Sequence, residues 1–299
     1  MKVSYLNDDF FGRLETLALN LRADLSGFFG GKHLVKTYGQ TVEFADYREY
    51  QLGDDIRRVD WNLYSRFEKF FIKLFTDERQ MHVQVFLDCS ASMGKADPNK
   101  AAYATAVAAA FGFLAVHNMD KLSIHLVKGD RAENPFGTIV GKTSFFKAIR
   151  TLEETEFTGD CDLSSAIVGC QEVGNKDGIT IIVSDFFSDN DFKKAIDYLA
   201  FKKRQVLLVQ VLDEEEADPT FDGRYQLTDS EAVDVSDPKN MRIRITRSAL
   251  KAYAKALAEY NAEIREYCAS RGADFITLNT TQAIERVLFG ELLKVGILE

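Results

Sequence analysis

The chain has 299 residues, of which 46% are hydrophobic and 28% are charged, and its formal net charge is −9. This composition is typical of a folded chain with a sizeable core, and the length accommodates one large α/β domain or two smaller domains. Phosphate backbones repel an acidic chain, so we do not expect nucleic acid as a general partner.

The first 80 residues predict a helix followed by extended chain. Leucines recur at helical spacing between Asp8 and Leu25. Glycines then interrupt the pattern, and residues 35–50 have the composition of strands. A turn is predicted at Gly53-Asp54-Asp55, and a short strand over residues 70–75.

From residue 81 onward, short apolar strands alternate with helices. This alternation predicts an α/β fold with a doubly wound, mostly parallel sheet. We therefore divide the chain into an N-terminal segment, residues 1–80, and an α/β domain, residues 81–299. The expected strands are 83–87, 122–127, 179–183, 206–212 and 275–278, with an edge strand within 130–141 and a hairpin over 225–235 that turns at 228–230. The expected helices are 99–118, 144–152, 163–173, 190–202 and 247–271, with a final helix from about residue 281.

The sequence also predicts where the protein resides. The uncharged stretch that starts at Ala101 is expected to be a buried helix, because a membrane span needs about 20 predominantly apolar residues. The N-terminus has no apolar run of the signal-peptide type. Four widely spaced cysteines favour reduced thiols over disulfides or a zinc site. We expect a cytoplasmic protein without a membrane span.

Polar residues follow two of the predicted buried strands. Ligands bind at the carboxyl ends of the strands in such sheets, which directs attention to residues 88–92, 158–162 and 184–187. Asp88, Ser90 and Ser92 alternate in the first of these loops, so their oxygens can face one hard cation such as Mg²⁺. Asp185 and Asp162, or less favourably Asp160, would add carboxylates. The alternative is a helix-capping turn, since Asp and Ser are good N-caps.

Two resemblances sharpen this interpretation. Residues 83–278 resemble a von Willebrand factor A-like domain, whose first metal-binding motif is similar to Asp88-x-Ser90-x-Ser92-Met93 and whose last is similar to Ser184-Asp185. The segment from Arg48 to Asn62, together with this motif, resembles the bacterial domain-of-unknown-function 58 family over roughly residues 30–290. Members of that family are often encoded beside MoxR-type AAA+ ATPases. The resemblance thus implies a metal-ion-dependent adhesion site and a partner or adaptor of such an ATPase.

The second loop departs from the family pattern. Where the family usually has Gly-Thr-Asp-Leu, this chain has Asp160-Cys161-Asp162-Leu163, so Cys161 takes the position of a Thr that reaches the metal. A neutral thiol is a poor ligand for Mg²⁺. The metal would then bind weakly, bind through water or be a softer ion. Thr158 could substitute only if the loop is shifted, and Cys161 is otherwise a buried filler.

We therefore predict a metal-ion-dependent protein-interaction module rather than an enzyme. Mg²⁺ or Mn²⁺ would be held by Asp88, Ser90, Ser92 and Asp185, with Cys161 and Asp162 beside it. A metal-dependent hydrolase that uses the same carboxylates and a metal-free scaffold are the alternatives.

The charged segment near the predicted turn has two interpretations. It is either a partner-docking surface or a turn that fastens the N-terminal segment to the main sheet, with Trp61 in a core. The candidate docking residues are Arg48, Asp54, Arg57 and Asp60.

Overall fold

A computed structural model describes residues 5–20, 43–51, 54–76, 80–94, 98–174, 178–187, 192–219, 223–227, 241–287 and 290. The chain forms two compact units, one made of Met1–Phe29 with Met81–Glu299 and the other of Gly30–Gln80. The division expected from the sequence keeps residues 1–80 together. The N-terminal helix, however, belongs to the larger unit.

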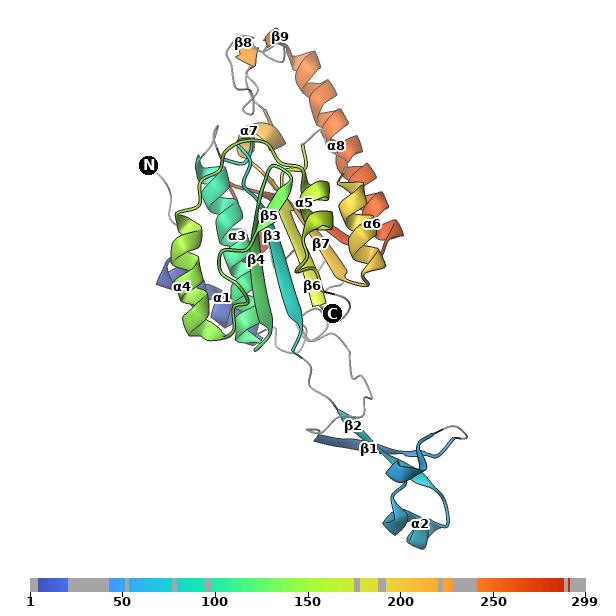
Figure 1. Cartoon of the computed structure of the whole chain (residues 1–299). Coiled ribbons are helices and arrows are strands. Elements are labelled where there is room, and N and C mark those ends of the chain that lie inside the picture. The colour runs from blue at the N-terminus through green and yellow to red at the C-terminus, as the bar shows by residue number, and fades with distance from the viewer. Residues whose placement is uncertain are drawn as a thin grey trace. The chain divides into compact units, whose positions relative to one another are not determined.

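The larger unit is built on a mostly parallel six-stranded sheet in the order β10-β7-β6-β3-β4-β5 (Figure 1). Only β5 runs antiparallel to its neighbour, which confirms the predicted edge strand. The strands are β3 (His82–Asp88), β4 (Lys121–Lys128), β5 (Arg131–Glu133), β6 (Gly178–Ser184), β7 (Gln205–Leu212) and β10 (Asp274–Asn279).

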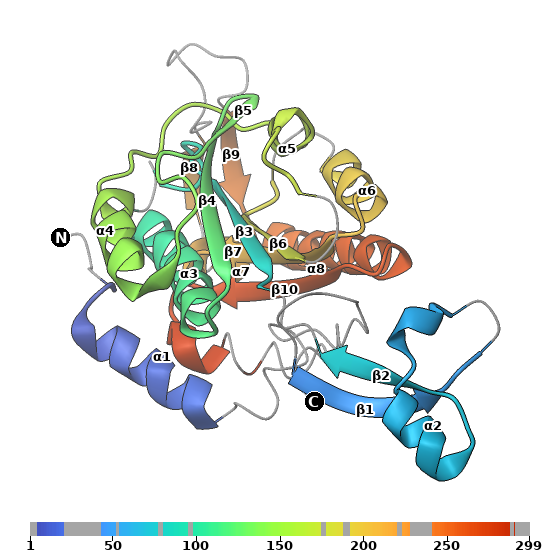
Figure 2. The ribbon, with the colours of Figure 1, turned by 60° about the horizontal axis from the view of Figure 1, so that its bottom comes forward.

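Helices cover both faces of this sheet, because successive side chains of a strand point to opposite faces and both sets are buried. In β3, Val85 and Leu87 belong to one apolar core and Phe86 to the other. The first core includes α1 (Asp8–Asn20), α3 (Pro98–His117) and α4 (Gly141–Glu153), and the second includes α5 (Leu163–Gly169), α6 (Lys193–Phe201) and α8 (Arg247–Ser270) (Figure 2).

Helix α3 is the buried helix expected from the alanine-rich stretch. Among the described residues it is the one helix long and apolar enough to cross a membrane, and 89% of that stretch is buried inside the protein. A core helix with both long sides covered needs no polar face, which accounts for the uniform apolarity.

Helix α8 begins and ends at the predicted signals. The Thr246 hydroxyl accepts a hydrogen bond from the Ala249 N–H at 3.2 Å, and Gly272, just past the end, has a φ of 67°. The second strand of the predicted hairpin before it lies outside the described residues. The described partner of β8 (Gly223–Leu227) is β9 (Met241–Ile245). The expected turn at 228–230 lies outside the described residues.

The described residues of the smaller unit form a two-stranded antiparallel ribbon, a 3-10 helix and one short α-helix (Figure 1). Its elements are β1 (Glu43–Glu49), the 3-10 helix η2 (Ile56–Arg58), α2 (Trp61–Phe67) and β2 (Phe71–Thr76). The extended chain predicted before residue 43 lies outside the described residues, as does the end of the N-terminal helix predicted beyond residue 20.

Candidate functional site

The candidate site lies where two neighbouring parallel strands end. β3 ends at Asp88, β6 ends at Ser184, and the two strands pair along their lengths. The Ala91 N–H donates to the Gly159 carbonyl at 2.8 Å, which joins the loop after β3 to the loop before α5. These contacts bring together the three loops that the strand ends predicted.

Asp88 is a buried carboxyl group that accepts two hydrogen bonds. It is 3% exposed, and it accepts hydrogen bonds from the Ser90 N–H at 2.9 Å and from the Ser184 hydroxyl at 2.6 Å. Burial, and then repulsion from Asp185, raise the pKa of Asp88 despite these bonds. A cation bound here would relieve both the desolvation and the repulsion.

Two hydroxyls and a thiol lie in the loops around Asp88. The Oγ atoms of Ser90 and Ser92 are 3.0 Å apart, so only one of them donates to the other and further lone pairs remain. Cys161 is buried, and burial followed by the neighbouring Asp88 carboxylate raises the pKa of its thiol. The thiol is therefore protonated at neutral pH and is a weak partner for a hard cation.

Asp185 is held by a strained turn after β6. Its Oδ1 accepts the Phe187 N–H at 3.0 Å. The intervening Phe186 has a φ of 58°, an unusual conformation for a bulky residue. Its carbonyl accepts a hydrogen bond from the Tyr260 hydroxyl, and its ring is buried. Strain of this kind persists only when the surroundings enforce it, so Tyr260 and the core around Phe186 fix the direction of the Asp185 carboxylate.

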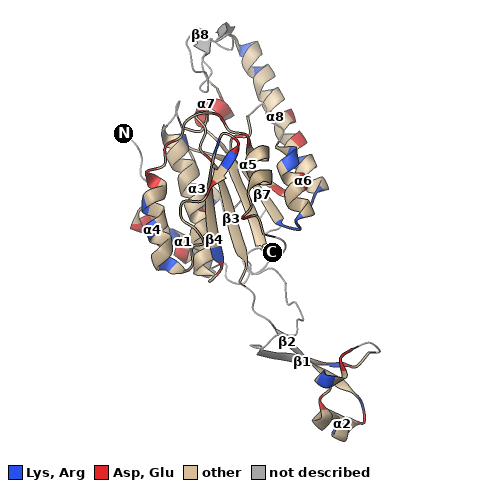
Figure 3. Cartoon of the chain, in the orientation of Figure 1, with Lys and Arg blue, Asp and Glu red and all other residues tan. Residues whose placement is uncertain are grey.

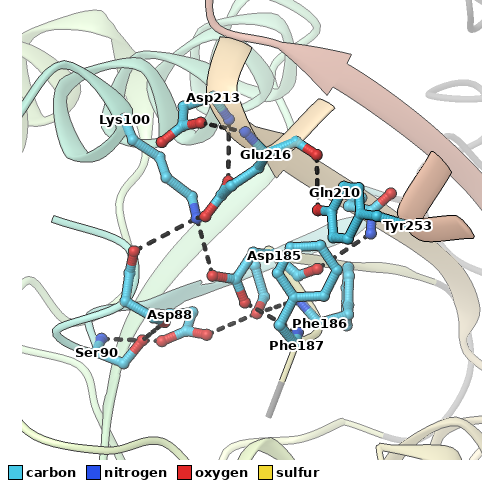
Figure 4. Close-up of polar contacts among 12 residues, drawn as sticks. Asp88, Ser90, Lys100, Asp185, Phe186, Phe187, Gln210, Asp213, Glu216 and Tyr253 are labelled. Atoms are coloured by element: carbon cyan, nitrogen blue, oxygen red, sulfur yellow. Dashed lines mark hydrogen bonds and ion pairs between the residues drawn. The ribbon is translucent and has the colours of Figure 1, made fainter. Parts of the chain in front are cut away.

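A buried lysine reaches the site from helix α3 (Figure 4). The Lys100 Nζ lies 2.9 Å from Asp185 Oδ2, 2.7 Å from Glu216 Oε1 and 3.4 Å from the Ser92 carbonyl oxygen. Lys100 is 1% exposed. Burial opposes its charge, but Asp185 and Glu216 outweigh burial, and the pKa of Lys100 is raised.

Carboxyl groups outnumber ammonium groups in this site. Asp185 and Glu216 pair with the ammonium of Lys100, and Asp88 is a third carboxyl group, whose pKa is raised by burial and by Asp185. A divalent cation would favour the ionised form of Asp88. No group of three or more His, Cys, Asp or Glu side chains suited to a metal occurs among the described residues. The remaining ligands would therefore have to be serine hydroxyls and water.

Asp162 hydrogen-bonds to helix α5 rather than to Asp88 or Asp185. It caps helix α5, where its Oδ1 accepts the Ser165 N–H at 3.0 Å and its Oδ2 accepts the Ser165 hydroxyl at 2.7 Å. Asp162 therefore fixes the start of α5 and the preceding Cys161.

In the smaller unit, three of the four candidate docking residues make local contacts. Arg48 donates to both oxygens of Asp54 at 2.9 Å. The backbone N–H of Gln51, and then Arg48, lower the pKa of Asp54. Asp60 caps α2 through the Asn62 N–H. These contacts shape the segment, whereas the side chain of Arg57 is exposed.

The expectation that Trp61 lies in a core was wrong. Trp61 is 57% exposed, and α2 has no buried residue. Its ring contacts Tyr64 and Phe70, whose own rings stack 4.5 Å apart. The aromatic residues of this short helix therefore form a surface cluster within the smaller unit.

Sequence reasoning missed Lys100, Glu216 and Tyr260. Lys100 carried a usable signal, since it is the charged residue that immediately precedes a long uncharged helical stretch. A charge in the first turn of a buried helix needs a buried partner. Glu216 and Tyr260 come from distant, locally ordinary segments and carried no such signal.

The fold and the site define an α/β protein with an acidic, hydroxyl-lined site at the carboxyl edge of a mostly parallel sheet. Residues 46–262 match the family described as "Protein of unknown function DUF58". The chain belongs to this family, as the resemblance of residues 48–62 predicted.

Mycobacterial relatives extend over most of the chain. Proteins described as uncharacterised, Rv1480 of Mycobacterium tuberculosis and Mb1516 of Mycobacterium bovis, are each 26% identical to it over 272 residues. The similarity covers 89% of this chain and 84% of each relative.

Solved structures show only a distant likeness. The conserved hypothetical protein BatB from Bacteroides thetaiotaomicron is 15% identical with a TM-score of 0.42, over 72% of this chain and 98% of that one. Proximal thread matrix protein 1 from the mussel byssus is 13% identical with a TM-score of 0.39, over 72% and 45% of the two chains. At these scores the likeness bears on neither fold nor function.

Proposed function

We propose that the larger unit is a von Willebrand factor A-type domain that binds a protein partner through a divalent cation. Asp88, Ser90, Ser92 and Asp185 would hold Mg²⁺ or Mn²⁺. The observation that carries the proposal is the convergence of these oxygens beside Asp88, a buried carboxyl group with a raised pKa, in a site where carboxyl groups outnumber the single ammonium of Lys100.

The donor set suits a hard cation. Its members are carboxylate and hydroxyl oxygens, which Mg²⁺ prefers, and Mg²⁺ keeps several waters when few carboxylates bind it. The protonated thiol of Cys161 beside Asp88 supplies no anionic ligand, which favours weak binding. The bound ion would act as a Lewis acid with exchangeable positions.

Such an ion retains affinity for one more carboxylate. We propose that an Asp or Glu of the partner supplies it, and that the partner is a MoxR-type AAA+ ATPase, as the family resemblance implies. Helix α7 (Glu214–Ala217) adds a row of acidic residues near this edge of the sheet (Figure 3). Its exposed Glu214 and Glu215 would attract basic residues around the partner's carboxylate. The proposal places both proteins in the cytoplasm.

A second candidate is a metal-free interaction domain. The observation in its favour is Lys100, whose ammonium already pairs with Asp185 and compensates part of the negative charge of the site. In that case the loop after β3 would act as rigid scaffold and partner binding would be independent of metal.

Calorimetric titration with Mg²⁺ and Mn²⁺ distinguishes the two candidates. The metal proposal expects one site in the wild type, lost in Asp88→Ala and weakened in Ser90→Ala. Asp162→Asn is the matched control, because it removes a carboxylate from the same edge while keeping an oxygen that can cap α5. It should bind the ion like the wild type.

Partner binding is tested separately. The full chain is used to recover the purified ATPase with and without chelator, for the wild type, Asp88→Ala and Asp162→Asn. The proposal expects recovery to fall in chelator and in Asp88→Ala only. Equal recovery in every lane would exclude a metal-dependent interface and favour the metal-free domain.

A further inference from the structure

Lys100 places a permanent cation next to a proposed metal ligand. Its Nζ lies 2.9 Å from Asp185 Oδ2, while Asp185 Oδ1 accepts the Phe187 N–H at 3.0 Å. Both oxygens of Asp185 are thus engaged. A divalent ion that uses Oδ2 must displace the ammonium or share this oxygen with it, and like charges at that separation repel strongly in a buried site.

Lys100 has a second anionic partner. Glu216 Oε1 lies 2.7 Å from Nζ, on the α7 side of the site. Because Lys100 is 1% exposed, its ammonium cannot reach water without a movement of the surrounding chain. If it leaves Asp185, Glu216 is the carboxylate that keeps the buried charge compensated.

Glu216 is itself fixed by several contacts. Its Oε2 accepts the Asp213 N–H at 3.0 Å, and its own N–H donates to Asp213 Oδ1 at 2.7 Å, a reciprocal cap of α7. The Tyr253 hydroxyl of α8 donates to the Glu216 carbonyl at 2.7 Å. A chain of contacts therefore runs from Asp185 through Lys100 and Glu216 to α7 and α8 (Figure 4).

We infer that Lys100 is a built-in competitor of the divalent cation. It pairs with Asp185 when the ion is absent, and it yields this carboxylate and keeps Glu216 when the ion binds. Lys100 thereby lowers the ion affinity and couples occupancy of the site to α7. This inference rests on the proposed function, because it concerns the regulation of the same site.

Two substitutions should act in opposite directions. Lys100→Met keeps the aliphatic length of the side chain and removes the competing charge, so the ion should bind at least about tenfold more tightly. This factor is modest compared with the repulsion expected between like charges in a buried site. Glu216→Gln removes the carboxylate that receives the displaced ammonium, so the ion should bind several-fold more weakly. General damage to the site would weaken both variants.

The experiment is calorimetric titration of Mn²⁺ and Mg²⁺ into the full chain and its variants. Glu214→Gln is the control for Glu216→Gln, because it makes the same charge change at an exposed position of α7. Lys142→Met controls for Lys100→Met at an exposed ion pair with Glu15. Both controls should stay within about twofold of the wild type. Amide hydrogen exchange over residues 214–217 should change on adding Mn²⁺ to the wild type but not to Lys100→Met.

The outcomes separate this inference from the proposed function. Tighter binding in Lys100→Met with weaker binding in Glu216→Gln supports the inference, as does binding seen only in Lys100→Met. If the wild type and Lys100→Met bind the ion equally well, the inference is overturned while the proposed function stands. Weaker ion binding in both Lys100→Met and Glu216→Gln also overturns the inference alone. Absence of binding in the wild type and in Lys100→Met overturns both. If Lys100→Met does not fold, the ion affinity of Glu216→Gln tests the inference alone. An ion affinity of Glu216→Gln equal to or above that of the wild type refutes the inference.

Discussion

Removing the Tyr260 hydroxyl should loosen the turn that aims Asp185. In Tyr260→Phe, the Phe186 carbonyl loses its bond to α8, and a typical hydrogen bond contributes about 0.5–1.5 kcal/mol to stability. The left-handed φ of 58° at Phe186 itself costs about 1 kcal/mol or more, so relaxation of this strain partly offsets the loss. We therefore expect the free energy of unfolding to fall by only about 1 kcal/mol.

The effect on ion binding should be larger in relative terms. Once Phe186 can relax, the Asp185 carboxylate is no longer held in one direction, and we expect divalent-ion affinity to fall about three- to tenfold, up to about 1.4 kcal/mol. Urea unfolding and calorimetric titration measure the two quantities. Tyr267→Phe is the control, because it removes a hydroxyl from the same helix near Asp197, away from the site. Unchanged ion affinity in Tyr260→Phe, or an equal loss in the control, would refute the positioning role.

Three further predictions concern single side chains. Burial raises the pKa of Asp120 from 3.8 to about 6, so the folded state holds its proton more tightly, and this contribution to stability is complete below pH 3.8 and lost as the pH rises through 6. Between pH 4 and 7, the free energy of unfolding of the wild type should therefore fall by about 1–2 kcal/mol relative to that of Asp120→Asn, after allowance for residual solvent screening. Urea unfolding at each pH measures this difference. A pH-independent difference would contradict this. Asp60→Ala removes the cap of α2 and should destabilise the smaller unit by about 1 kcal/mol. Unfolding of this unit is measured by the fluorescence of Trp61, the single tryptophan of the chain. An unshifted transition would mean that the cap is dispensable. Cys161→Thr replaces a soft thiol beside Asp88 by a hydroxyl and should tighten Mg²⁺ binding several-fold in calorimetry, whereas equal or weaker binding would mean that this loop does not face the ion.

The main sheet was predictable because its signals are local. Strands such as 83–87 and 179–183 are short apolar runs, and the helices between them have their own periodicity and caps, so the alternation alone predicts a mostly parallel sheet. The carboxyl ends of parallel strands share one edge, which is why Asp88 and Asp185 could be paired across 97 positions of sequence without coordinates.

The hairpin and Trp61 show the limits of local signals. The composition near residue 228 suggested a tight turn, whereas the described partner of β8 is a strand that starts at Met241, because strand pairing is decided by non-local partners. An isolated large aromatic residue such as Trp61 is compatible with a core or with a surface, and only the surrounding fold decides between them.

By itself the sequence determined the mostly parallel α/β architecture, the membership of residues 46–262 in the DUF58 family and the oxygen-rich loop after β3. Only the tertiary structure brought Lys100 to Asp185 and Glu216, which lie 85 and 116 positions further along the chain. No periodicity links residues so far apart. A buried ammonium is stable only where the fold supplies its carboxylates, and that supply depends on where the fold places the start of helix α3 and the short α7.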